Sequence, residues 1–130
     1  MDADEVFRAA RDRLIALRAD HRRATEEFVW PDVGPSFNWA TDWFDRIAEG
    51  NERIALRIVE EDGRDQQVSF DRMRQRSDQV GGWLAEHRVA PGDHVMLVLG
   101  NQVELWESML AVMKIGAVLL PTTTVLTPGR

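Results

Sequence analysis

The chain has 130 residues, of which 44% are hydrophobic and 29% charged, as is typical of one globular domain with a substantial core. Its net charge of −6 argues against a nucleic-acid partner, whose phosphates require a basic face. The absence of cysteine excludes disulfides, thiolate zinc sites and cysteine nucleophiles. Acidic residues near the N-terminus argue against a signal peptide, and the longest apolar run, 116–121, is too short to span a bilayer, so we expect a cytoplasmic protein.

Residues 2–28 are predicted to form one amphipathic helix, because apolar side chains recur three or four residues apart (Val6, Ala10, Leu14 and Leu17). Trp30 precedes Pro31, and a residue before proline is kept out of the α region, so we expect the helix to end there. Residues 31–37 contain two prolines and a glycine and are predicted to form an extended loop.

Residues 38–130 are predicted to form an α/β subdomain that is distinct from the N-terminal helix and loop of residues 1–37. The subdomain begins with a short helix over 38–49, for which Asn38 is a suitable N-cap. Aromatic side chains recur on one side of this helix (Trp39, Trp43 and Phe44). Such a cluster can be a ligand platform, but it is more often part of the core.

Two β-rich runs, 54–60 and 66–70, flank the turn signal Glu61-Asp62-Gly63-Arg64 and predict a hairpin. A long helix over 70–87 is expected to follow.

Ser69 is expected to cap that helix, with Asp71 in its first turn. Gly81 and Gly82 each cost about 1 kcal/mol relative to alanine inside a helix. We therefore expect them to pack closely against the sheet. A phosphate-binding loop is the alternative, but no strand precedes these glycines and no lysine follows them.

The strongest pattern is a strand–helix–strand unit near the C-terminus. Its first strand, 94–99, is a continuous apolar run after His94, as expected for a parallel strand covered on both faces. Asn101 is expected to start the helix with Glu104 as its capping partner, and Gly116 to end it in the left-handed conformation. The second strand, 117–120, stops at Pro121. The unit predicts a small parallel sheet with helices on both faces and the hairpin at its edge.

Few residues indicate chemistry. His21, His87 and His94 lie on three different predicted elements and lack metal-ligand spacing, and the sequence contains no nucleophile elbow or phosphate-loop motif. The hydroxyl-rich segment after the last strand lies where ligands bind in open parallel sheets. It can be read as the lining of a pocket or as a threonine-rich linker, and its hydroxyl-bearing residues are Thr122, Thr123, Thr124 and Thr127.

From Phe37 to Pro121 the order of motifs resembles the N-terminal region of AMP-forming acyl-CoA synthetases, which belong to the adenylate-forming superfamily. The segment FNWATDWFDRIAEGNERIAL looks most like the medium-chain and aromatic branch. The Gly-Asp-x-Val strand, the following helix and the Gly-Ala-x-x-x-Pro strand match the superfamily pattern. One departure is Arg88, which stands where relatives usually have a glycine.

The resemblance implies a partial N-terminal domain of such an enzyme, whose parent uses ATP, Mg and CoA. The family's phosphate loop, nucleotide-binding motifs and catalytic lysine do not match any part of this sequence, so we expect the fragment to bind no cofactor and to be inactive. The segment after the last strand carries over only a CoA- or substrate-proximal role for Thr124 and Val125.

The expected function is therefore that of an N-terminal fragment of a medium-chain or aromatic acyl-CoA synthetase. The alternative is a standalone, non-catalytic binding or interaction module that has kept the same scaffold. The expected partners are the remainder of the synthetase chain and a second copy of this chain. The second copy would bind by pairing at an uncovered sheet edge or by exchange of a terminal element.

Overall fold

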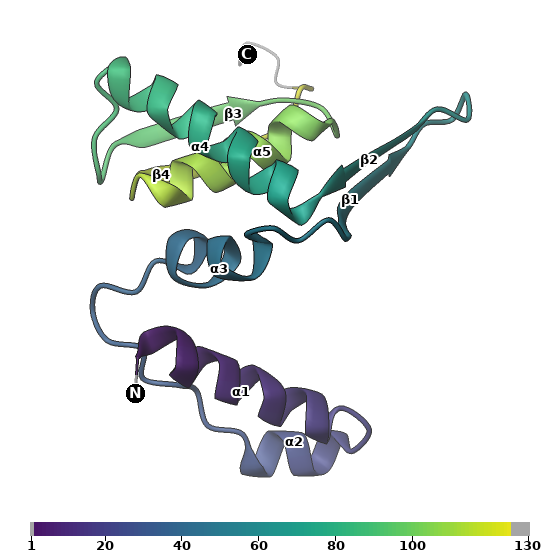
Figure 1. Ribbon diagram of the computed structural model, residues 1–130, viewed down its shortest axis with the longest axis vertical. Coiled ribbons are helices and arrows are strands. Elements are labelled where there is room, and N and C mark those ends of the chain that lie inside the picture. Colours follow the sequence, from purple (N-terminus) through teal and green to yellow (C-terminus); the bar gives the residue numbers. More distant parts are fainter. Residues whose placement is uncertain (1, 126–130) are drawn as a thin grey trace.

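The computed structural model describes residues 2–125, which form two lobes joined by irregular chain (Figure 1). The first lobe contains two helices, α1 (Ala3–Leu17) and α2 (His21–Glu27). The second contains, in order, a π-helical segment η1 (Trp39–Phe44), α3 (Asp45–Ala48), β1 (Ile54–Val59), β2 (Asp65–Ser69), α4 (Phe70–Glu86), β3 (His94–Val98), α5 (Val103–Lys114) and β4 (Val118–Thr122).

The parallel unit is confirmed. β3 and β4 pair in parallel from His94 opposite Val118 to Val98 opposite Thr122, and α5 forms the crossover between them. Helix α5 packs against both strands, and α4 packs against α5. The α/β fold class predicted from the sequence is therefore correct, and Gly116 ends α5 at φ +72° as expected.

Two details of the predicted sheet differ within residues 2–125. Helices cover one face of the parallel pair, whereas the apolar side chains on the opposite face are 40–62% exposed: Met96, Val98, Val118 and Leu120. The hairpin is present, with Gly63 at φ +88° in its turn, but β1 and β2 form a separate two-stranded sheet and do not pair with β3 or β4. The expectation of an edge hairpin is thus wrong for the part of the chain described.

The N-terminal helix is broken into two, contrary to the single helix expected over 2–28. Helix α1 ends at Leu17, and Asp20 then starts α2 by accepting a hydrogen bond from the Arg23 N–H at 3.0 Å. This N-cap competes with continuation of the first helix because it satisfies a backbone donor of a new one. Helix α2 also ends before the Trp30-Pro31 pair, at Glu27.

Asn38 joins the start of η1 to the end of α5. Its side-chain oxygen accepts from the Ala40 N–H at 3.0 Å, which confirms the predicted N-cap. Its amide nitrogen donates to the carbonyl oxygens of Met113 at 2.8 Å and Lys114 at 3.3 Å. Two groups at the C-terminal end of α5 that lack helical partners are thereby satisfied. The helix expected over 38–49 is present, with a π-helical first part.

The core lies where η1, α3, α4 and α5 meet. Its buried members are Ala40, Phe44, Ala48, Met73 and Leu110. Trp43 is also buried, so the core interpretation holds for these two aromatic residues of η1, whereas Trp39 remains 41% exposed.

Helix α4 begins as predicted, with Ser69 accepting from the Arg72 N–H at 3.1 Å. Gly81 does allow a close approach, but to α5 instead of the sheet, because a Cβ there would lie 3.5 Å from Ile115 Cγ2. Gly82 has open space around it, and nothing in the structure explains it. Just after α4, Arg88 adopts φ +67°, the left-handed conformation that costs a non-glycine residue about 1 kcal/mol.

The predicted cap of α5 is wrong. The helix begins at Val103, and Gln102 occupies the N-cap position without a side-chain hydrogen bond. The Asn101 side chain accepts instead from the Trp106 indole N–H at 3.4 Å.

Lys114, the only lysine in the sequence, ties three helices together. Its side chain is 7% exposed, and its Nζ donates to Asp78 Oδ1 at 2.6 Å and to the Arg74 carbonyl oxygen at 3.2 Å, both on α4. The Nζ also lies 2.7 Å from Asp45 Oδ1 on α3 as an ion pair. Burial raises the pKa of Asp45, and the Lys114 charge opposes that rise only in part.

Replacement of Lys114 by methionine should lower the free energy of unfolding by about 2–3 kcal/mol, because it leaves Asp45 charged and partly buried without its cation. Urea denaturation followed by circular dichroism measures this difference. The matched control is Arg64→Met in the exposed hairpin turn, where the ion pair with Asp62 should contribute less than about 1 kcal/mol. Equal midpoints for the two variants would contradict the role assigned to Lys114.

Candidate functional site

The sequence-predicted site lies at the carboxyl end of the parallel pair. β4 ends at Thr122, which is half-buried opposite Val98 at the end of β3. Beyond it the chain turns, and the Val125 N–H donates to Thr123 Oγ1 at 3.1 Å. One hydroxyl of the segment is therefore committed to holding the turn, while Thr127 lies outside the described residues.

Thr124 and Val125, the two residues carried over from the family resemblance, both lie in this turn and are exposed. Val125 is 78% exposed. The structure brings Thr122 to the same edge as Val98, but it surrounds neither Thr124 nor Val125 with contacting side chains from other elements that could enclose a ligand. This edge is one wall of a site in an open sheet.

A cavity of about 420 Å³ lies away from that edge, between η1, the hairpin, α4 and α5. Its lining is apolar and consists of Trp39, Phe44, Ala55, Leu56, Phe70, Met73, Trp106, Met109, Leu110 and Met113. The helical periodicity had assigned several of these side chains to the core. The cavity itself carries no sequence signal, because the space depends on how four elements meet.

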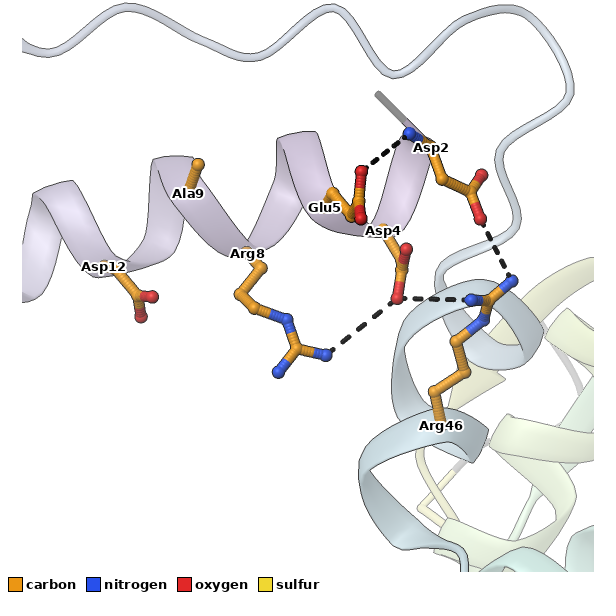
Figure 2. Close-up of a pocket in the computed structure, with 7 residues that line it drawn as sticks. All are labelled: Asp2, Asp4, Glu5, Arg8, Ala9, Asp12 and Arg46. Atoms are coloured by element: carbon orange, nitrogen blue, oxygen red, sulfur yellow. Dashed lines mark hydrogen bonds and ion pairs between the residues drawn. The ribbon is translucent and has the colours of Figure 1, made fainter.

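A second, charged cavity of about 660 Å³ lies between the first turns of α1 and the α3 residue Arg46 (Figure 2). Arg46 Nη1 is 3.3 Å from Asp4 Oδ2, and its Nη2 is 3.5 Å from Asp2 Oδ2. Asp4 is 7% exposed. The opposite charges compensate one another, so this cavity is an interface between two parts of the chain and has the wrong charge balance for a dedicated ion site.

The carboxyl groups with displaced pKa values lie elsewhere. Hydrogen bonds and ion pairs with arginine lower the pKa of Glu27 and Asp65, and hydrogen bonds from the Arg64 backbone and side chain lower that of Asp62. A hydrogen bond from the Gly50 N–H, supported by Arg74, lowers that of Asp71, whereas burial raises that of Asp45. Each has a structural partner, and none lies at the carboxyl ends of β3 and β4, where a catalytic acid or base would be useful.

The three histidines lie apart, on α2, at the end of α4 and on β3. Residues 2–125 contain no group of three metal-ligating side chains, and no helix in this range is long and apolar enough to cross a membrane.

The order of elements defines the class of protein. A short aromatic helix, a separate hairpin, a long capped helix and a parallel strand–helix–strand unit form the framework of an adenylate-forming domain, with only one wall of its site. Residues 43–130 match the family model of AMP-binding enzymes, and the chain belongs to that family.

Relatives agree with this assignment. Over 69 residues the chain is 36% identical to a 3-oxocholest-4-en-26-oate–CoA ligase of Rhodococcus rhodochrous, covering 53% of this chain and 12% of that protein. The crystal structure of a Brucella canis acyl-CoA synthetase matches with a TM-score of 0.57 and 32% identity, covering 59% of this chain and 14% of that chain. Klebsiella oxytoca NpsA in complex with 3-hydroxyanthranilyl-AMSN matches with a TM-score of 0.59 and 27% identity, covering 67% and 17% of the two chains.

The chain therefore spans about one-eighth of the length of the curated relative and less than a quarter of these solved structures. The matched structures include an N-terminal subdomain of NpsA, with a TM-score of 0.56 and 27% identity. The framework described above corresponds to a part of a much larger enzyme.

Asp71→Asn should make the chain less stable at neutral pH, with a difference that shrinks on acidification. The folded-state pKa of Asp71 lies below its ordinary value of 3.8, so its ionised form stabilises the fold above that value. The contribution is lost as the pH falls through the lowered pKa. Urea midpoints at pH 7, 5, 4 and 3 measure the effect. Glu61→Gln, in the exposed hairpin turn, is the control and should shift the midpoint little; a pH-independent loss for the Asp71 variant would contradict the charge-based explanation.

Proposed function

We propose that this chain forms the N-terminal part of an acyl-CoA synthetase that activates a medium-chain or aromatic carboxylic acid with ATP. The resulting acyl-adenylate would be transferred to CoA, in fatty-acid or aromatic-acid metabolism in the cytoplasm. The observation that carries this proposal is the family match over residues 43–130 on the parallel framework of β3, α5 and β4. Two relatives support the substrate class: one is named for forming the CoA ester of a carboxylic acid, and NpsA is described with a 3-hydroxyanthranilyl group.

ATP, Mg and CoA are proposed for the parent enzyme, with none bound by this chain alone. The described residues do not fit these groups. Gly100 follows β3, but a Cβ at this position would meet nothing within 4 Å, so the backbone there forms no tight cradle. No cluster of three metal-ligating side chains stands nearby in residues 2–125. Thr124 and Val125 stay proposed as residues close to CoA or substrate in the full enzyme.

An ATP–pyrophosphate exchange assay tests this division of labour. The purified 130-residue chain, incubated with Mg-ATP, labelled pyrophosphate and a series of straight-chain and aromatic acids, should show no acid-dependent exchange. A chain extended with the rest of an adenylate-forming domain should exchange with acids of the proposed class. Acid-dependent exchange by the short chain would overturn the claim that the phosphate-handling residues lie outside it, and no exchange by the extended chain with any acid would overturn the enzymatic proposal.

We further propose that the isolated chain self-associates through the parallel pair. Both strands have edges without a partner in residues 2–125, and one face presents apolar side chains, among them Met96 and Leu120. In the full enzyme the remainder of the synthetase chain is the proposed cover for this face.

Light scattering at tens of micromolar should show a mass above that of the monomer, and Leu120→Lys should reduce it because a charge on the uncovered face opposes burial. The control is Trp83→Lys, which changes a side chain of similar exposure on α4. A monomer for the unmodified chain would count against self-association, and equal effects of the two variants would count against this face.

A further inference from the structure

The α1–α2 lobe stands apart from the rest of the structure (Figure 1). Residues 28–38, which connect it to η1, contain no helix or strand. The family match begins at Trp43, so the whole lobe lies outside the matched segment. Helix α1 makes its main contacts with α2 and with η1. Its attachment to the conserved framework of the family thus depends on a small set of side chains, which is independent of the proposed function.

The apolar part of the attachment centres on Trp43. The Phe7 ring of α1 lies 5.0 Å from the Trp43 ring and is stacked on Phe37 at 5.4 Å, measured between centroids. The guanidinium groups of Arg8 and Arg11 lie 5.5 Å and 5.0 Å from the same indole ring. Trp43 is 5% exposed, and α1 supplies much of its cover.

The charged part centres on Arg46, which bridges the two carboxylates at the start of α1 (Figure 2). Asp2 caps the helix in a capping box with Glu5, and negative charge is favourable at this end of a helix. Asp4 is buried against Arg46, with Arg8 at 3.9 Å on its own helix. Helix α1 therefore presents two carboxylates to Arg46, followed one turn later by an aromatic ring for Trp43.

The neighbouring residue on α3 is anchored in the opposite direction. Asp45 pairs with Lys114 of α5, so α3 stays attached to the core through a contact that does not involve α1. Removal of α1 would leave that anchor in place.

We propose that Trp43 and Arg46 form a docking surface for a helix that begins with carboxylates and carries an aromatic residue one turn later, and that α1 occupies this surface as a detachable arm. Release of the arm uncovers Trp43 and leaves the unit of α4, β3, α5 and β4 folded. The Arg46 side chain is 51% exposed, so its ion pairs are accessible to solvent and weaken at high salt, where the Debye length is about 3 Å at 1 M.

Hydrogen exchange of the full chain, resolved by peptide mass spectrometry, tests the proposal. Arg46→Glu should accelerate exchange in residues 3–17 by about tenfold or more while exchange in 70–86 and 103–114 stays unchanged. Raising NaCl from 0.1 to 1 M in the unmodified chain should act in the same direction. The matched control is Arg22→Glu, which reverses an equal charge on the exposed face of α2, where Arg22 pairs only with Glu26 in the described residues.

A double-mutant comparison separates docking from general destabilisation. Asp4→Asn and Arg46→Met remove the same ion pair, so their combination should accelerate exchange in α1 by little more than the larger single effect. Equal acceleration in α1, α4 and α5 would show one cooperative unit and overturn the proposal, as would unchanged α1 exchange in Arg46→Glu. Protection of α1 that disappears on dilution together with a dimer would place the arm on a second copy and overturn the intramolecular arrangement.

Discussion

The buried ammonium group of Lys114 is the constraint on which the arrangement of the larger lobe depends. It is the only lysine, in a chain that otherwise uses arginine for positive charge. A compact ammonium can approach two carboxylates and a carbonyl oxygen from three directions, whereas a planar guanidinium favours side-by-side pairs. Because its partners lie on α3 and α4 while it ends α5, a single charge fixes the relative positions of three helices. Asn38 adds a second tie to the same end of α5.

Local signals in the sequence predicted most of the elements. Ser69, Asn38 and Gly116 act within a few residues of their own positions, and their predicted roles as caps are confirmed. The missed break at Asp20 is also local, but the apolar periodicity on both sides of it masked the cap. Gly81 shows the limit of local reasoning: its small size did predict a close approach, but only the packing of α4 on α5 identifies the partner as Ile115.

The site was less predictable than the fold. The sequence located the edge where β3 and β4 end, because strand direction and crossover follow from the pattern alone. It could not locate the opposite wall, because Thr124 and Val125 acquire neighbours only from segments outside the described residues. Both the apolar cavity near Trp39 and the contact between Asp4 and Arg46 join residues more than thirty positions apart in sequence, and no spacing rule connects them.

The burial of Lys114 has a consequence for the covalent chemistry of the chain. With no cysteine and one lysine, the chain has a single side-chain amine and no thiol. That amine is 7% exposed and held between carboxylates, so in the folded chain acylating reagents meet only the N-terminal amine. Each opening of the α3–α4–α5 junction adds one reactive nitrogen. The rate at which Lys114 becomes acylated therefore counts openings of the core, and the chain contains its own chemical recorder of local unfolding.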